Sequence, residues 1–309
     1  MIKPAKTQSE LQRFAPVFVA VTVIFAIAAT FLLDHCSFLT STKDTYDEGV
    51  RQATIFAVLG GMTFWCYALS VITPPGRIPQ TAEWQYIEEA APSSASTSAV
   101  QLIETKKDGR RRACKWCAQF KPDRAHHCRV CKACVLRMDH HCPWIGTCVG
   151  FGNHKPFLLL LFYSTITCGF VAYMTGQQYG RRALQAADDF TGSLLGMSLM
   201  ILSGALGMVL GGFFCFHIYL TTSALTTIEY CEKMRTPDFD RKVYDRGMLG
   251  NLKQVLGWNP LLWLLPIGGA EGTGLSFKSK SSKVGPKKSS LRPSSPPETS
   301  REQQPLLNN

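Results

Sequence analysis

Charged side chains are missing from four long stretches of this chain, although the mean hydropathy of the whole sequence is only +0.02. A segment of roughly 20 apolar residues is long enough to cross the hydrocarbon core of a bilayer. This uneven distribution excludes a single large soluble core. It predicts an all-α polytopic membrane protein with four transmembrane helices, at Pro16–Leu33, Ala53–Thr73, Phe157–Gly176 and Gly192–Leu220.

Acidic residues are also scarce, with 22 Asp and Glu against 33 Lys and Arg and a formal net charge of +11. Of the basic residues, 29 lie before the first span, between the second and third spans, or after the fourth. Because basic flanks tend to stay on the cytosolic side of a membrane, both termini and the middle loop are predicted to be cytosolic. The positive charge then favours anionic lipid headgroups as a partner. Nucleic acid is not expected, because we find neither a basic recognition helix nor an aromatic stacking surface.

No internal repeat is evident, and the chain divides by composition instead. The segment Glu88–Ser98 has the composition of a flexible connector, and the Ser-, Pro- and Lys-rich tail is predicted to be disordered from about residue 278. The predicted regions are a cytosolic N-terminus with helices one and two (1–73), a cytosolic linker (74–113), a cysteine-rich domain (114–156), helices three and four (157–220) and a cytosolic C-terminal region (221–309).

Seven of the twelve cysteines fall between Cys114 and Cys148. Cytosolic thiols stay reduced, so CxxC pairs interspersed with histidines favour metal binding over disulfides. A structural zinc ion takes four Cys or His ligands, so two Cys3His sites would use six cysteines and leave one spare. A nucleophilic thiol needs an adjacent base and a group that orients the base. Cys142 has that neighbourhood, in the sequence Asp139-His140-His141-Cys142.

From Cys114 to about Phe157 the chain resembles the cysteine-rich domain of the DHHC-type protein S-acyltransferases, or palmitoyltransferases. Thr226-Thr227-Ile228-Glu229 is similar to the TTxE motif of that family, and Asn251 to its C-terminal asparagine. The resemblance implies two structural zinc ions with interleaved ligands. One zinc ion would be held by Cys114, Cys117, His127 and Cys134, and the other by Cys128, Cys131, His141 and Cys148.

Two positions depart from the family pattern. Pro74-Pro75-Gly76 stands where the family usually has Asp-Pro-Gly, and Thr147 replaces the usual asparagine before the last zinc cysteine. Neither departure replaces a nucleophile, a base or a metal ligand, so the expected reaction class is unchanged.

The resemblance implies acyl transfer by a two-step ping-pong mechanism. Cys142 would attack a long-chain acyl-coenzyme A, with His140 as base and Asp139 orienting it, and a cysteine of a membrane or membrane-associated protein would then take the acyl group. The cations of the KPxRxH pattern are candidates for the coenzyme A phosphates. They are Lys121, Arg124 and His126.

The acyl chain is expected to lie between the spans. Tyr163 and Thr167 are four residues apart and therefore share a helix face. Polar groups within a span tend to face protein or a cavity, so this face is either part of the acyl cavity or a helix contact.

Other interpretations remain open at this point. A membrane-anchored zinc adaptor of ubiquitin-ligase type would use the metal domain without a catalytic cysteine. Cys231 follows the fourth span, where a lipidated cysteine could lie. Glu302–Leu307 has the form of an acidic dileucine signal, which favours a lysosomal or vacuolar route, while Golgi or endoplasmic reticulum residence is an equal alternative.

Overall fold

The computed structural model describes residues 10–86, 102–106, 108–184, 190–233 and 242–277. The predicted connector Glu88–Ser98, the predicted disordered tail from about residue 278 and the sorting signal Glu302–Leu307 lie outside these ranges.

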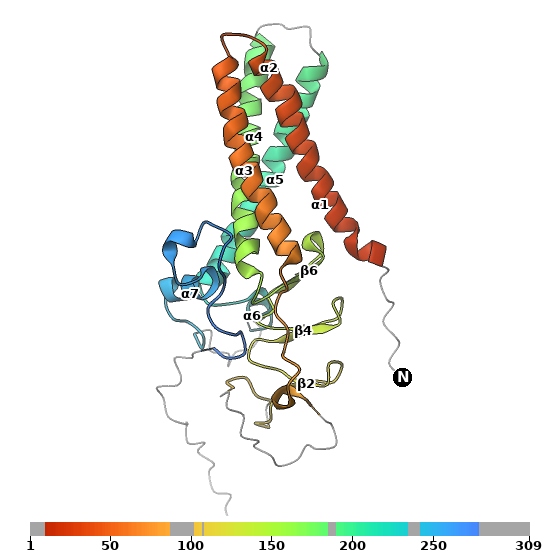
Figure 1. Ribbon diagram of the computed structural model, residues 1–309, viewed down its shortest axis with the longest axis vertical. Helices are drawn as coiled ribbons and strands as arrows, with labels where there is room; N and C mark the ends of the chain where they lie inside the picture. The colour runs from red at the N-terminus through yellow and green to blue at the C-terminus, as the bar shows by residue number, and fades with distance from the viewer. Residues whose placement is uncertain (1–9, 87–101, 107, 185–189, 234–241, 278–309) are drawn as a thin grey trace, which may run out of the picture.

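Four long helices form an elongated bundle, with the cysteine-rich loop at one end (Figure 1). Helix α1 (Glu10–Thr30) continues through a π-helical segment, η1 (Phe31–Cys36), into α2 (Ser37–Thr40). The others are α3 (Tyr46–Ile72), α4 (His154–Leu184) and α5 (Phe190–Thr222). The segments that are long and apolar enough to cross a membrane are Phe14–Thr40, Tyr46–Ile72, His154–Gly180 and Leu194–Thr222. The four predicted spans are thus confirmed, and the chain is a multi-pass membrane protein.

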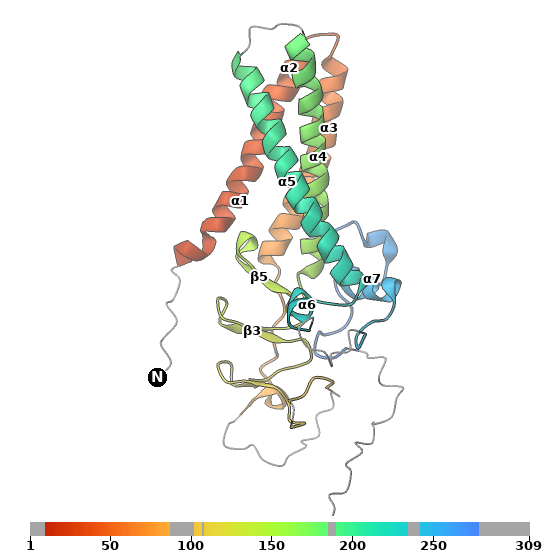
Figure 2. The same cartoon turned by 180° about the vertical axis from the view of Figure 1, so that it is seen from behind.

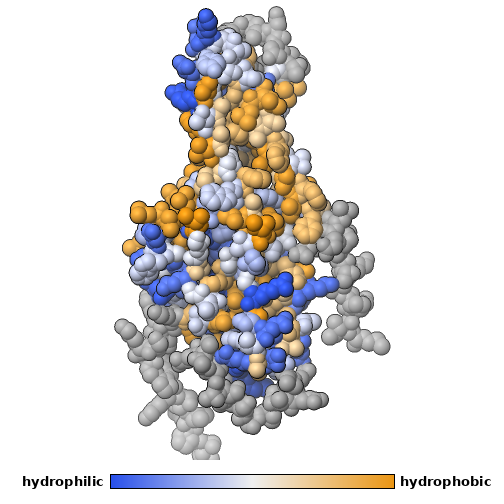
Figure 3. Space-filling view, in the orientation of Figure 1, coloured by the Kyte–Doolittle hydropathy of each residue, from blue (hydrophilic) through white to orange (hydrophobic). Residues whose placement is uncertain are grey.

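On the face that Figure 3 shows, apolar side chains, drawn in orange, cover much of the middle of the bundle. Val58, Ile201, Met208 and Val209 are all more than half exposed. Contiguous exposed apolar surface of this kind marks a surface that water does not cover, and here it suits lipid.

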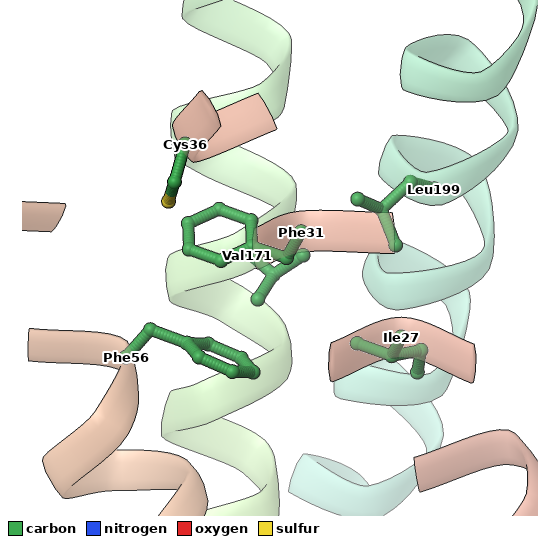
Figure 4. Close-up of a cluster of buried hydrophobic side chains, with 6 residues drawn as sticks. All are labelled: Ile27, Phe31, Cys36, Phe56, Val171 and Leu199. Atoms are coloured by element: carbon green, nitrogen blue, oxygen red, sulfur yellow. The ribbon is translucent and has the colours of Figure 1, made fainter. Parts of the chain in front are cut away.

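A cluster of six buried side chains packs the helices together at the end of the bundle far from the cysteine-rich loop (Figure 4). Phe31 is fully buried at its centre, with its ring 4.8 Å from that of Phe56. The ring of His35 stacks on Phe31 at 4.7 Å. His35 Nε2 donates a hydrogen bond of 2.7 Å to Gln52 Oε1, so a polar contact between η1 and α3 adjoins the apolar cluster. The cluster consists of Ile27, Phe31, Cys36, Phe56, Val171 and Leu199.

Thr167 and Tyr163 share a helix face but contact different partners. Thr167 Oγ1 lies 3.0 Å from Thr63 Oγ1 on α3, which makes a buried hydroxyl pair between the helices. The Tyr163 hydroxyl donates to the carbonyl oxygen of Leu264 at 2.7 Å. Tyr163 thus holds the C-terminal segment, and Thr167 lies at a helix contact.

Three two-stranded antiparallel hairpins fill the cysteine-rich loop (Figures 1 and 2). They are β1 (Ala113–Cys114) with β2 (Gln119–Phe120), β3 (His126–Cys128) with β4 (Ala133–Val135), and β5 (His140–Cys142) with β6 (Thr147–Val149).

The hairpins recur every 14 residues. Cys114, Cys128 and Cys142 end the first strands of the three hairpins, and Ala118, Lys132 and Gly146 all have positive φ in the turns. The expectation that the chain has no internal repeat is therefore wrong for residues 113–149. The repeat is visible in the sequence itself, where His126-His127-Cys128 recurs as His140-His141-Cys142 and Cys134-Val135 as Cys148-Val149.

The C-terminal segment folds back against the foot of the bundle. It contains α6 (Thr227–Lys233), α7 (Met248–Leu256) and the short helix η5 (Pro260–Leu262). Lys155 Nζ donates to the carbonyl oxygens of Leu262 and Ile267 at 2.9 and 2.6 Å. The buried Asn251 amide donates to Thr222 O at 2.7 Å and to Asp245 Oδ1 at 2.8 Å. Asn251 therefore satisfies a carbonyl at the end of α5 that the helix itself leaves unpaired.

Candidate active site and metal clusters

Four predicted ligands meet between the first and second hairpins. His127 Nδ1 lies 3.5 Å from Cys114 Sγ, 3.3 Å from Cys117 Sγ and 3.9 Å from Cys134 Sγ. Zinc bond lengths and tetrahedral angles give nitrogen-to-sulfur separations of about 3.6 Å between ligands. The group has the spacing needed to hold a metal ion at its centre.

The second predicted set meets between the second and third hairpins. His141 Nδ1 lies 3.7 Å from Cys128 Sγ, 3.4 Å from Cys131 Sγ and 3.7 Å from Cys148 Sγ. The middle hairpin contributes to both clusters, so the two sites interleave. A metal ion in either site would link adjacent hairpins.

Cys142 belongs to neither cluster. It holds the repeat position of Cys114 and Cys128, but Ile145 occupies the place of the second cysteine of the pair. Its thiol is 6% exposed and packs in an apolar cluster with Tyr67 and Phe157. The third hairpin therefore presents a free thiol where the other two present metal ligands.

His140 lies beside this thiol. Successive side chains of a strand point to opposite faces, so His140 and Cys142 share one face of β5 while His141 faces the metal cluster. His140 Nδ1 is 2.7 Å from Asp139 Oδ2, and an ionised carboxylate can only accept, so Nδ1 donates. Cys142 is close enough to His140 to help raise the pKa of that imidazole.

The electrostatics favour a charged pair in this site. Burial disfavours the imidazolium of His140, but the hydrogen bonds with Asp139 and Cys142 outweigh that effect and raise the pKa of His140 to about 9. Burial likewise opposes ionisation of Asp139, yet the hydrogen bond with His140 holds the pKa of that carboxyl well below its usual range. Asp139 is therefore an anion that fixes the orientation of the His140 ring.

Thr227, the first residue of α6, holds the same carboxylate. Thr227 donates its backbone N–H to Asp139 Oδ1 at 2.9 Å and its hydroxyl to Oδ2 at 2.8 Å. Figure 2 shows α6 beside β5, which is the arrangement that these contacts require. The third hairpin is tied to α3 as well, because the Tyr67 hydroxyl donates to Trp144 O at 3.0 Å.

Arg124 contacts Glu229, the last residue of the Thr226-Thr227-Ile228-Glu229 motif, and its side chain is buried away from solvent. Its guanidinium pairs with the Glu229 carboxylate through Nε at 2.7 Å and Nη2 at 2.8 Å, and Nη2 also donates to Ala224 O at 2.9 Å. The side chains of Arg124 and Glu229 are 0% and 2% exposed. This placement corrects the expectation that Arg124 reaches the coenzyme A phosphates. The other two predicted cations, Lys121 and His126, are half-buried, and burial lowers the pKa of His126.

The sequence reading missed a further histidine of this site, His217 on α5. It is fully buried, and its Nδ1 lies 4.0 Å from Asp139 Oδ2. Its ring centroid is 5.6 Å from that of His140. The available signal was an imidazole inside a span, since titratable groups at membrane depth tend to be functional.

Comparison with known proteins assigns the family. Residues 107–234 match the family model of the DHHC palmitoyltransferases. Probable protein S-acyltransferase 16 of Arabidopsis thaliana is 36% identical over 283 residues, which cover 85% of this chain and 92% of that protein. The chain belongs to this family. Probable protein S-acyltransferase 15 of the same plant is 34% identical over 229 residues, 71% of this chain and 84% of that protein. Palmitoyltransferase ZDHHC15 of Rattus norvegicus is 30% identical over 292 residues, 87% of this chain and 82% of its own length.

The two departures from the DHHC family pattern lie in segments that backbone hydrogen bonds hold in place. Gly152 N donates to Pro75 O at 3.0 Å, and Leu136 N donates to Gly76 O at 3.1 Å. These bonds use main-chain carbonyls and do not need an aspartate side chain at position 74. Thr147 pairs with Cys142 across the third hairpin.

The Arg124–Glu229 pair should show strong coupling. Removing one partner of a buried ion pair leaves the other charge uncompensated, which costs about 3 to 5 kcal/mol, whereas replacing both by apolar residues costs far less. We therefore expect Arg124→Met and Glu229→Leu each to lower the thermal unfolding midpoint more than the double variant does.

The exposed pair of Arg110 and Asp108 supplies the control for this double-mutant cycle. Asp108 is 44% exposed, and Asp108→Ala should leave the midpoint unchanged. Additive effects of Arg124→Met and Glu229→Leu would contradict a direct interaction between the two side chains.

Proposed function

We propose that this chain is a protein S-palmitoyltransferase, which moves a long-chain acyl group from acyl-coenzyme A through a Cys142 thioester to a substrate cysteine. The observation that carries the proposal is that Cys142 lies outside both metal clusters, shares a strand face with His140, whose pKa it helps to raise, and faces the apolar interior of the bundle. Membership of the DHHC family supports the same reaction class. The adaptor hypothesis gives this arrangement no role and is not retained.

Two zinc ions fit the two Cys3His clusters. Thiolate and imidazole are the ligands that structural zinc takes, and four protein ligands leave no open position for substrate. The eight predicted ligands would therefore hold the hairpins together, and other residues would carry out acyl transfer.

The reaction needs one base in both steps. In the first, the proton of Cys142 rests on His140, whose raised pKa favours the imidazolium; the Cys142 sulfur attacks the thioester carbon, the bond to coenzyme A breaks, and the coenzyme A thiolate takes the proton from His140. In the second, His140 accepts the proton of the substrate cysteine, whose sulfur attacks the acyl carbon, and Cys142 leaves and is reprotonated. Asp139 keeps Nε2 of His140 towards the thiol throughout.

The acyl chain would lie in the apolar interior between α1, α3, α4 and α5, which we call the seam. The apolar cluster that contains Cys142 also contains Phe157 and Leu161 of α4, and Val171 belongs to the far cluster around Phe31. At 1.5 Å per residue, Phe157 to Val171 spans about 21 Å along the helix axis. This length suits a long acyl chain whose far end lies at Phe31. Burial of such a chain is worth about 0.8 kcal/mol per CH2.

Coenzyme A itself would stay at the hairpin end of the bundle. Lys121 and His126 remain our candidates for its phosphates, and Arg124 has the structural role described above. We expect this end to face the cytosol because its flanks are basic, and substrate cysteines of membrane or membrane-associated proteins would be available there. An endomembrane on the lysosomal or vacuolar route, or in the Golgi or endoplasmic reticulum, is the proposed location.

The nucleophile can be tested by Cys142→Ser. We expect acyl-enzyme formation and transfer to be abolished with two zinc ions per chain retained, because this thiol is not a ligand. Labelling with a palmitoyl-coenzyme A analogue and metal analysis measure both. Cys231→Ser, at an exposed cysteine, is the matched control. Wild-type labelling of the serine variant, or loss of one zinc ion, would refute the assignment.

Adjacent histidines should behave differently when replaced. His140→Ala should slow acylation about 10²- to 10⁴-fold, the usual contribution of a general base, with both zinc ions retained. His141→Ala should lose metal and become protease-sensitive, because structural zinc contributes folding free energy. Zinc content and limited proteolysis distinguish the two, and equal metal loss would show that their roles are not separate.

The depth of the acyl site can be tested from two directions. Thr167→Tyr should obstruct the deeper part and shift preference towards shorter donors, since overpacking costs about 1 to 3 kcal/mol. Phe31→Ala should open the far end and favour longer donors. The assay is competition between acyl-coenzyme A donors of different length, with zinc content checked. Thr63→Val, which removes the hydroxyl partner without narrowing the seam, is the control. If Thr167→Tyr keeps the wild-type preference for acyl-chain length, Thr167 serves helix packing and does not line the acyl site.

A further inference from the structure

His217 is a histidine of the fourth span that the reaction above does not use. Its side chain is fully buried, and within the part of the chain that the structure describes neither ring nitrogen has a hydrogen-bond partner. A buried polar group without a partner destabilises the fold, and an apolar side chain of similar size avoids that cost. Packing alone therefore does not account for an imidazole here.

The surroundings of His217 point towards the proposed catalytic pair. Its Nδ1 is 4.0 Å from Asp139 Oδ2, the oxygen that also accepts from His140. Its ring packs against that of His140 at 5.6 Å and edge-on against Phe157 at 5.2 Å. Phe213, at 4.4 Å and also edge-on, packs against the same ring. The imidazole is thus confined between the catalytic residues and aromatic side chains of α4 and α5.

The Asp139 carboxylate is contacted from two sides. Thr227 of α6 donates to both of its oxygens, and His217 of α5 approaches Oδ2 from a different element. A shift of about 1 Å would bring Nδ1 within hydrogen-bond distance. A neutral imidazole can donate through Nδ1 and keep its ring against His140 at the same time.

We propose that His217 is a positioning residue for acyl transfer. It supports the Asp139 carboxylate with an N–H donor and forms the wall that keeps the His140 ring directed at Cys142. This inference rests on the proposed function, because it assigns His217 a role in that same reaction. It adds a residue from a transmembrane helix to a site otherwise built from the third hairpin and α6.

Two replacements separate donation from packing. Asparagine carries an N–H donor on its δ nitrogen, near the position of Nδ1, whereas phenylalanine keeps the aromatic shape and has no donor. We expect His217→Asn to acylate within about threefold of wild type. We expect His217→Phe to slow single-turnover acylation of Cys142 by 10- to 100-fold, with an unchanged KM for palmitoyl-coenzyme A and both zinc ions retained. Ser203→Ala removes another buried polar side chain of α5 and should leave the rate unchanged.

A second readout does not depend on acyl transfer. The rate at which iodoacetamide modifies Cys142, followed by peptide mass mapping, should fall about tenfold in His217→Phe and change little in His217→Asn. If the phenylalanine variant loses metal, His217→Leu takes its place in the comparison. Wild-type rates in the donor-free variant, or equal losses in both variants, would overturn the positioning role, and a raised KM with an unchanged maximal rate would assign His217 to substrate binding instead. If wild-type Cys142 forms no acyl-enzyme at all, it is the proposed function that fails, and the alkylation rates still decide whether His217 positions the pair.

Discussion

The buried carboxylate of Asp139 is the point on which the site depends. An ionised carboxylate away from water is stable only when its oxygens are hydrogen-bonded or paired with charge. Here His140 and Thr227 supply the donors, so the third hairpin and α6 are held against each other. The Arg124–Glu229 pair makes a second buried connection between the hairpins and α6. Since α6 follows the fourth span directly, these contacts fix the cysteine-rich loop on the helical bundle.

The 14-residue repeat explains how a metal-binding scaffold can present a reactive thiol. Each hairpin ends its first strand with a cysteine at the same place, and the metal-binding turns add a second cysteine three residues later. Ile145 takes that second place in the third hairpin, so Cys142 has the rigid position of a ligand without being one. The alternation of side chains along β5 places His140 on the same face as Cys142 and His141 on the face of the metal cluster.

Local patterns predicted the four spans and singled out Cys142, whereas the two ligand groups came from the resemblance to the DHHC family. Spans follow from length and composition. Counting ligands leaves one spare cysteine, and the neighbouring Asp139 and His140 identify it as Cys142. Arg124 was misread because the carboxylate that buries it is Glu229, 105 residues further along the chain. His217 was missed for the same physical reason, since only tertiary packing brings α5 to Asp139. The 14-residue repeat was open to prediction, because His-His-Cys and Cys-Val recur at that spacing in the second and third hairpins.

Phe157 connects the apolar seam to the charged site. It packs in the cluster that contains Cys142, and its ring lies 5.3 Å from His140 and 5.2 Å from His217. A close-packed interior transmits a displacement at one side chain to its neighbours. Under the proposed function, an acyl chain in the seam beside Phe157 would press on the residues that set the orientation of His140. This contact gives a physical route by which filling the membrane-embedded part of the protein can complete the alignment of the base with the thiol.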